Sequence, residues 1–299
     1  MPHIRLTACL AVVALLATAC VGEPRDGREP VVVGVGSTAE QHVLASLTVA
    51  ALASEEIPTE VREELGTTVG LRREATNGRI DLFWDYTGAA WALGLGEQAP
   101  PADPEESWER VRQADRRNGL LWLEASAADA TFALFVRSDA IPGDGNATMS
   151  WLAGELSGAE RSLCADPDFL LRPGGLDALA GEYAIDLARV PRRPTGEAEA
   201  IAAVEEERCF AGLATATSGA ARLSDLAPVA DDLGVLPAFV AAPVVRAESP
   251  ADVTEVAEAL EPVARGLDTQ TLARINAQYE GGGDLEELAE QFLEEVAAD

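Results

Sequence analysis

The sequence contains no lysine, and its histidines are only His3 and His42. The missing lysine excludes Schiff-base chemistry and a lysine general base. The chain also lacks a Gly-x-Ser-x-Gly elbow, a phosphate-binding Walker loop and a His-x-x-x-His pair, which hydrolases, nucleotide-dependent enzymes and zinc enzymes use. The sequence therefore predicts a protein that is not an enzyme and that has no cofactor and no metal. A hydrolase that works with two carboxylates is the enzyme alternative that stays open.

Basic residues are scarce as well. The chain has 22 arginines against 51 aspartates and glutamates, and its formal net charge is −29 at pH 7. Nucleic acids and anionic headgroups both require basic patches, so this composition argues against binding to either. The acidic excess alone does not predict a cationic ligand, because surface charge often serves solubility.

No apolar run is long enough to form a permanent membrane span. The run 10–17 follows a single basic residue, Arg5, and ends in small residues before Cys20. This predicts a signal peptide over 1–19. Its ending resembles that of bacterial lipoprotein signals, which implies a lipid on Cys20. Ordinary secretion, with Cys20 discarded, is the alternative. The polar stretch 20–30 is interpreted as a flexible tether.

Cysteine is also rare, with four residues in the chain. Cys9 leaves with the signal peptide and Cys20 takes the lipid, so Cys164 and Cys209 remain. In an oxidising compartment this pair predicts a disulfide, which stabilises its surroundings by ~3 to 4 kcal/mol in the chain-entropy model. Two buried free thiols are the alternative.

The rest of the chain alternates strand and helix patterns, which predicts an α/β protein. Strands are expected at 31–35, 61–65, 80–84, 120–123, 162–165 and 212–215, and helices at 40–54, 68–77, 105–118, 175–183, 195–207, 250–264, 269–279 and 285–296. Two runs without polar interruption, 131–136 and 239–245, are expected to cross between lobes. They divide the chain into lobe one, 31–131 plus 240–299, and lobe two, 132–239.

Six motifs in register resemble those of the substrate-binding proteins of ABC importers for osmoprotectants and quaternary amines. They lie at 35–41, 65–69, 78–88 (Gly-Arg-Ile-Asp-Leu-Phe-Trp-Asp-Tyr-Thr-Gly), 169–175, 225–232 and 237–246. The resemblance implies a type II periplasmic-binding-protein fold, with two α/β lobes that are joined by two crossing strands and close over a solute. It also implies an ABC permease and its ATPase as partners, and we expect a monomer.

Proteins recognise a quaternary ammonium by the faces of aromatic rings, and a carboxylate by a planar guanidinium. By resemblance, Tyr86 and Arg172 match the ligand-binding tyrosine and arginine of the family. Phe132 and Phe239 lie where the family has tyrosines, and Thr215 stands where a further ring is expected. The lysine that the family has after its first Gly-Ser is absent here. The resemblance thus implies a reduced aromatic site with Arg172 as its cationic anchor.

Each of these residues also has a structural interpretation. Phe132 and Phe239 could be core residues, since they lie on strands that are expected to be buried. Arg172 could cap a helix. Trp84 or Trp91 could supply a replacement wall of the site, but Trp84 is as well suited to the core.

Three carboxylates near these motifs, Glu40, Asp81 and Asp85, are interpreted as structural groups that bind backbone amides. The sequence as a whole predicts a lipoprotein on the outer face of the cytoplasmic membrane. By resemblance its solute is glycine betaine, choline, carnitine or a similar quaternary amine. A protein of the same fold that binds another small solute, or that acts as a sensor, is the alternative.

Overall fold

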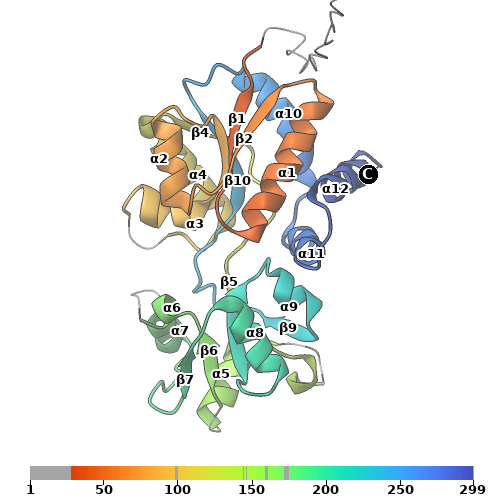
Figure 1. Ribbon diagram of the computed structural model, residues 1–299. Coiled ribbons are helices and arrows are strands. Elements are labelled where there is room, and N and C mark those ends of the chain that lie inside the picture. The colour runs from red at the N-terminus through yellow and green to blue at the C-terminus, as the bar shows by residue number, and fades with distance from the viewer. Residues whose placement is uncertain are drawn as a thin grey trace, which may run out of the picture.

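The computed structural model describes residues 28–97, 100–143, 145, 147–158, 161–171 and 175–298. Two five-stranded sheets form two lobes, one above the other in Figure 1. The predicted two-lobed α/β fold is therefore confirmed. The predicted signal peptide, Cys20 and Arg172 lie outside the described residues. Within those residues, no helix has both the length and the apolar character needed to cross a bilayer.

The first sheet has the strand order β2-β1-β3-β10-β4. Its strands are β1 (Val31–Gly34), β2 (Thr59–Arg62), β3 (Leu82–Tyr86), β4 (Leu120–Trp122) and β10 (Ala241–Arg246). Strand β1 pairs in parallel with β2 and β3, whereas β10 is antiparallel to β3 and β4. Apolar side chains on both faces of the central strands, such as Val33 and Phe83, are fully buried. The sheet therefore needs helices on both faces.

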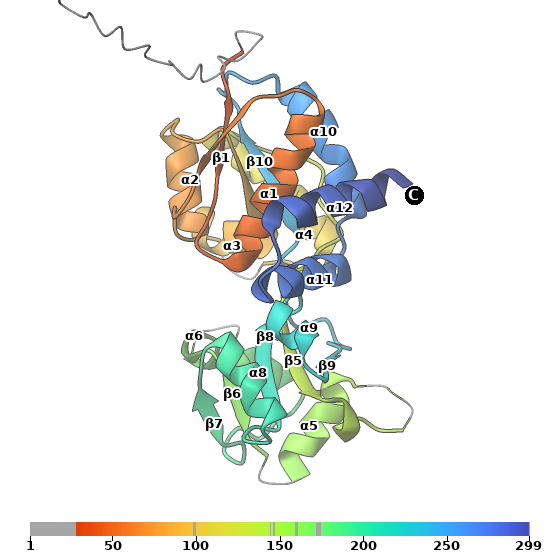
Figure 2. The same cartoon turned by 45° about the vertical axis from the view of Figure 1, so that its right-hand side comes forward.

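Helices α1, α10 and α12 cover one face of this sheet and α2 to α4 the other (Figures 1 and 2). The helical elements are α1 (Ala39–Ser54), α2 (Thr68–Thr76), α3 (Thr87–Ala89), η1 (Ala90–Gly94), α4 (Pro104–Asp115), η2 (Arg116–Asn118), α10 (Val253–Gly266), α11 (Thr269–Glu280) and α12 (Leu285–Ala298). Side chains start several of them: Asp268 accepts a hydrogen bond from the Thr271 amide at 2.7 Å at the start of α11. Asp268 is thus the N-cap of α11.

The second sheet has the order β7-β6-β8-β5-β9. Its strands are β5 (Phe132–Arg137), β6 (Leu163–Ala165), β7 (Arg192–Pro194), β8 (Ala211–Thr215) and β9 (Leu226–Val229), and its helical elements are η3 (Ser138–Ala140), α5 (Met149–Gly158), α6 (Pro167–Leu171), α7 (Leu176–Glu182), α8 (Glu197–Glu205) and α9 (Gly219–Leu223). The predicted disulfide is confirmed, with the sulfurs of Cys164 and Cys209 2.00 Å apart.

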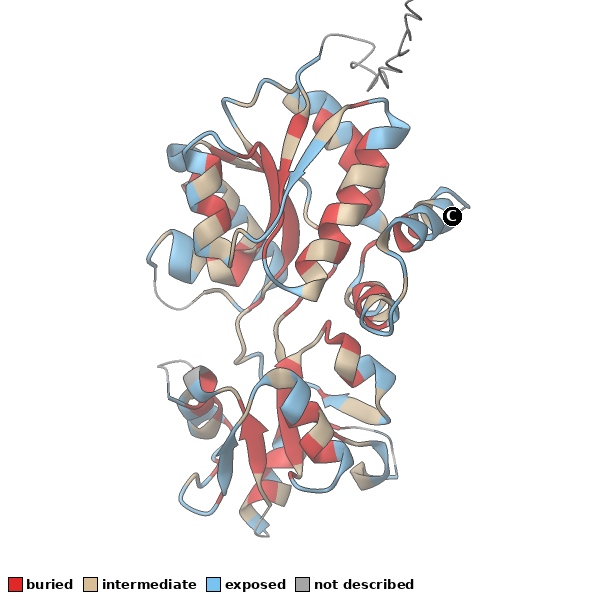
Figure 3. Cartoon of the chain, in the orientation of Figure 1, coloured by how far each residue is buried: buried red, intermediate tan, exposed pale blue. Residues whose placement is uncertain are grey.

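Sequence patterns missed or misplaced the short outer elements. Strand β2 is shifted from the expected 61–65 to Thr59–Arg62, and β7, β9, α5 and α9 were not expected. Both β2 and β9 are edge strands with exposed positions, so neither carries the continuous apolar signal of a central strand. Figure 3 shows the contrast between the buried central strands and these outer elements.

The two long apolar runs differ from the expectation in one respect. Each is a strand inside one sheet, β5 in the second and β10 in the first. The segments that cross between the lobes precede them and bind each other: Ala130 N donates to Phe239 O at 3.0 Å, and Ala241 N donates to Ala128 O at 2.9 Å. The apolar runs mark strands buried in a sheet, because a sheet requires apolar faces and a two-stranded link does not.

Helices provide a third contact between the lobes. Helix α11 lies against α9 at the junction (Figure 2). A Cβ at Gly219 on α9 would lie 2.6 Å from Glu280 Oε2 and 2.8 Å from Ala277 N on α11. Only a glycine permits this approach, so the two helices are in direct backbone contact at this point.

Candidate functional site

Four predicted site residues lie beside the junction of the lobes, three of them at strand ends. Tyr86 is the last residue of β3, Thr215 is the last residue of β8, and Phe132 is the first residue of β5. Phe132 and Thr215 are directly paired across β5 and β8, and Phe239 lies in the crossing segment before β10. The strand topology therefore brings together residues that are far apart in the sequence.

Three phenylalanines form a cluster, named here the aromatic group: Phe132, Phe169 and Phe239. The Phe132 ring centroid is 6.2 Å from that of Phe239, edge-on, and 5.6 Å from that of Phe169. Phe132 and Phe239 are half-buried, whereas Phe169 is only 1 % exposed. The prediction did not include Phe169, although it begins the motif at 169–175 that carried the resemblance. The aromatic group joins α6, β5 and the crossing segment.

Phe239 also touches the first lobe. A Cβ at Gly88 would lie 2.7 Å from the Phe239 ring, so the ring rests on the backbone of α3. Asp129 Oδ1 fixes the main chain on both crossing segments, because it accepts from Phe239 N at 2.8 Å and from Thr131 N at 3.0 Å. Burial raises the pKa of Asp129 above its usual value, and these two bonds oppose that shift. Phe239 is thereby held between the lobes.

Tyr86 is held by two neighbours on α1. Its hydroxyl donates to Glu40 Oε1 and accepts from Gln41 Nε2 at 3.4 Å. Burial, and next the Glu40 charge, raises the pKa of Tyr86 well above its usual value, so it stays protonated. Burial also raises the pKa of Glu40. Glu40 binds side chains here, namely Tyr86 and Asn276, and not the backbone amides that we expected.

On the second lobe, Thr215 is bound to a carboxylate. Its amide and its hydroxyl donate to the two oxygens of Glu197, at 3.2 and 3.3 Å. Glu197 is the first residue of α8 and is half-buried. Nothing in the sequence pattern set Glu197 apart from the other acidic residues of that helix, so the sequence analysis did not select it.

The two tryptophans, Trp84 and Trp91, pack in the two hydrophobic cores of the first lobe. Trp84 is 2 % exposed, and its indole N–H donates to the buried hydroxyl of Thr48 at 2.7 Å. It therefore belongs to the core between β3 and α1, which is the second of the two interpretations given above. Trp91 packs against the other core of the first lobe, beside Phe83 and Val111. Trp84 therefore does not supply the replacement wall, and Trp91 as that wall stays a prediction.

A buried ion network lies behind Tyr86. Arg72 binds Asp115 through two nitrogens, at 2.6 and 2.8 Å, and binds Asp85 at 3.2 Å. Asp85 also accepts from the Tyr86 amide at 2.9 Å and from Thr68 Oγ1 at 2.9 Å. Burial raises the pKa of Asp85 to about 6, against the Arg72 charge. Asp85 thus binds a backbone amide as expected, and the network fixes the end of β3.

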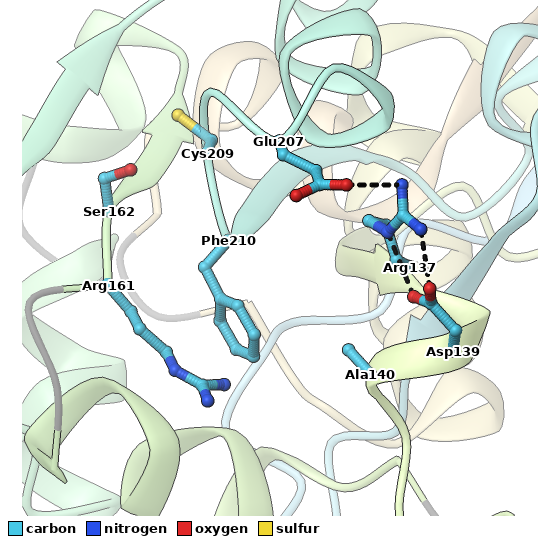
Figure 4. Close-up of a pocket in the computed structure, with 8 residues that line it drawn as sticks. All are labelled: Arg137, Asp139, Ala140, Arg161, Ser162, Glu207, Cys209 and Phe210. Carbon is cyan, nitrogen blue, oxygen red and sulfur yellow. Dashed lines mark hydrogen bonds and ion pairs between the residues drawn. The ribbon is translucent and has the colours of Figure 1, made fainter.

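A separate cavity of about 420 Å³ lies at the outer end of the second lobe (Figure 4). Its cations are already engaged. Arg137 pairs with Asp139 and lies 3.3 Å from Glu207, and Arg161 lies 3.9 Å above the Phe210 ring and pairs with Glu155. This cavity is therefore a poor site for an anionic solute, and it is remote from the aromatic group.

The two lobes, the paired crossing segments and the aromatic side chains between them define a solute-binding protein of the periplasmic type. The chain belongs to the family described as the substrate binding domain of ABC-type glycine betaine transport systems, whose model matches residues 29–295. It is thus a substrate-binding protein of an ABC transporter, and the family consists of binding proteins and not of enzymes.

Relatives and solved structures agree with this assignment. The chain is 28% identical to the glycine betaine-binding protein YehZ of Escherichia coli, over 94% of this chain and 95% of the relative. It is 28% identical to a glycine-betaine-binding protein of Pseudomonas aeruginosa, over 95% and 92%. The apo structure of YehZ matches with a TM-score of 0.78 over 89% of this chain and 98% of that one. A glycine betaine/carnitine/choline ABC transporter structure, 21% identical, matches in fold with a TM-score of 0.81 over 89% and 98%.

Proposed function

We propose that this protein binds a quaternary-amine solute, such as glycine betaine, choline or carnitine, between its lobes and delivers it to an ABC permease and its ATPase. The observation that carries the proposal is the contact of Phe132 with Phe239 at the junction of the lobes. Both side chains are half-buried, and a core role alone would favour full burial. The family and the names of the relatives support the same class of solute.

The chemistry of such a site is cation–aromatic attraction. A trimethylammonium group has no N–H donor, so ring faces hold it, at ~0.5 to 2 kcal/mol per ring. In the proposed site Phe132, Phe239 and Tyr86 supply rings and Thr215 a polar edge. Arg172 remains a prediction from the sequence, in which it would pair with the carboxylate of a zwitterionic ligand. Trp84 is left out because it lies in the core.

Closure of the lobes completes the proposed mechanism. The solute docks on one lobe, the crossing segments bend, and the other lobe then covers it and displaces water. Attraction between charges and rings strengthens as water leaves, because the effective dielectric constant falls. We further propose that the protein is a monomer held by a lipid on Cys20 at the outer face of the cytoplasmic membrane. This rests on the pattern of the first 20 residues.

Calorimetric titration tests the proposed solute. Wild type is titrated with glycine betaine, choline and carnitine, and so is Phe239→Leu, which keeps an apolar side chain but removes the ring. We expect the variant to bind about 2- to 30-fold more weakly, the equivalent of ~0.5 to 2 kcal/mol.

The matched control is Phe210→Leu, which removes a half-buried ring in the remote cavity of Figure 4. Its affinities should equal those of wild type. If Phe239→Leu binds as tightly as wild type, the aromatic site is wrong. If wild type gives no heat with any quaternary amine, the solute class is wrong.

A further inference from the structure

Three carboxylates from the two lobes lie at or near the proposed site. Glu40 lies in the first turn of α1, and Glu280 ends α11, both in the first lobe. Glu197 begins α8 in the second lobe. A site that binds any trimethylammonium compound needs aromatic faces but does not need this charge. The carboxylates therefore call for a separate explanation.

Glu197 is placed next to the aromatic group by its bonds to Thr215. These bonds measure 3.2 and 3.3 Å, and Thr215 is the direct cross-strand partner of Phe132. The carboxylate is thus one strand away from the ring that is proposed to face the ligand. Being half-buried, it is less screened by water than a surface charge.

Glu40 and Glu280 approach the same place from the first lobe. Glu40 accepts from Asn276 Nδ2 at 2.8 Å, and that nitrogen also donates to Thr217 O on the second lobe at 2.9 Å. Glu280 Oε2 lies beside the backbone of Gly219, where a Cβ would be 2.6 Å from it. The carboxylates therefore lie at the contact between the lobes.

Two further observations concern the same contact between the lobes. Asn276 is 3 % exposed, yet its Oδ1 has no hydrogen-bond partner among the described residues. Burial raises the pKa of Glu40 against hydrogen bonds that lower it, and the charge of Glu197 adds a minor part of that rise. Partial burial and then the charges of Glu197 and Glu40 raise the pKa of Glu280. Like charges are thus held near one another across the lobes, an arrangement that a bound cation would relieve.

We infer that Glu197, supported by Glu40 and Glu280, makes the site select a quaternary amine of net positive charge over a zwitterionic one. The inference rests on the proposed function and narrows its solute class. Choline and glycine betaine carry the same trimethylammonium group, so the rings treat them alike. Glycine betaine adds a carboxylate, which the Glu197 charge repels.

Calorimetric titration of the full-length protein with choline and with glycine betaine tests this inference. Wild type should bind choline more tightly. In Glu197→Gln the ratio of the two affinities should fall about tenfold, the effect of one unit charge at intermediate distance and dielectric constant. Glutamine keeps an oxygen that accepts from the Thr215 amide, so the local structure is preserved. Glu205→Gln, an exposed position on the same helix, is the control and should leave the ratio unchanged.

If Glu197→Gln does not fold, two other measurements still test the inference: the affinity ratio of wild type and that of a second variant. Glu280→Gln changes an exposed residue and should lower the ratio in the same direction by a smaller factor. An unchanged ratio in both variants would overturn the inference, as would tighter binding of glycine betaine by wild type, which is what an anchoring Arg172 predicts. Absence of heat with both solutes would instead overturn the proposed function itself.

Discussion

The two lobes share one architecture, but different interactions stabilise the interior of each. The first lobe buries charge: Arg72, Asp85 and Asp115 are 6, 0 and 0 % exposed. The second lobe has a disulfide between Cys164 and Cys209 instead. In the described residues, the buried charged side chains all come from the first lobe. The same architecture thus contains a buried ion network in one lobe and a covalent cross-link in the other.

The difference follows from what each sheet must organise. In the first lobe β3 ends in Asp85 and Tyr86, so the ion network fixes a strand end that belongs to the proposed site. In the second lobe the disulfide ties β6 to the segment just before β8, at the end of β8 opposite to Thr215. A network of hydrogen bonds and ion pairs fixes the orientation of side chains. A cross-link acts mainly by reducing the number of conformations open to the unfolded chain.

The largest expected effect comes from breaking the ion network. Arg72→Met leaves two buried carboxylates without their cation, and we expect unfolding free energy to fall by ~3 to 5 kcal/mol. Chemical denaturation followed by tryptophan fluorescence measures this loss, because Trp122 donates to Asp115 within the network at 2.8 Å. The control is Arg73→Met, an exposed neighbour on α2, which should change stability by less than about 0.5 kcal/mol. Equal losses of unfolding free energy in both variants would show that the buried network stabilises the protein no more than an exposed arginine does.

The next effect comes from removing the cross-link. The double variant Cys164→Ala, Cys209→Ala opens a loop with a sequence separation of 45 residues. We expect a loss of ~2 to 4 kcal/mol, because the unfolded chain gains freedom. Hydrogen exchange should accelerate at β6 and β8 and stay unchanged at β1 and β3. Equal acceleration in both lobes would contradict the idea that each lobe has its own means of stabilisation.

The smallest expected effect is a pH dependence that belongs to the first lobe. Burial raises the pKa of Asp85 to about 6, so the folded state takes up a proton at a pH where the unfolded state is still ionised. This group therefore adds stability as pH falls from about 7 to about 4, by ~2 kcal/mol. Asp85→Asn removes the titration while Arg72 keeps its bonds to Asp115.

Urea denaturation at several pH values measures this contribution. The unfolding free energy of wild type relative to Asp85→Asn should rise toward low pH. A difference that is independent of pH would mean that Arg72 keeps Asp85 ionised throughout the range. The disulfide variant serves as the control, because cross-linked cysteines do not titrate, and its difference from wild type should be flat.

Much of the fold could be predicted from the sequence. The central strands β1, β3 and β10 are apolar runs, and α11 follows its capping residue, Asp268, close to the expected range 269–279. These elements carry their signal locally, in side-chain periodicity and in capping residues. Edge strands such as β2 and β9 carry weaker signals, because they pair on one side only and part of their side chains face solvent. They therefore lack a continuous apolar run.

The proposed site could be predicted only in part. The motifs selected Tyr86, Phe132, Thr215 and Phe239, and all four lie at the junction of the lobes. The same reasoning could not place Trp84, whose neighbours on the strand allow either orientation. It also could not select Glu197, which is one of several acidic residues on its helix and becomes distinct only through its bonds to Thr215.

Local periodicity, motif order and a count of cysteines were enough to predict the two-lobed α/β class, the family and the cysteine pair. The folded structure was needed to show that Trp84 faces Thr48, that Phe239 rests on Gly88, and that Asn276 bonds both Glu40 and the Thr217 carbonyl at the contact between the lobes. The physical reason is that strand register and helix packing set which side chains meet, and those contacts join residues that are distant in the chain.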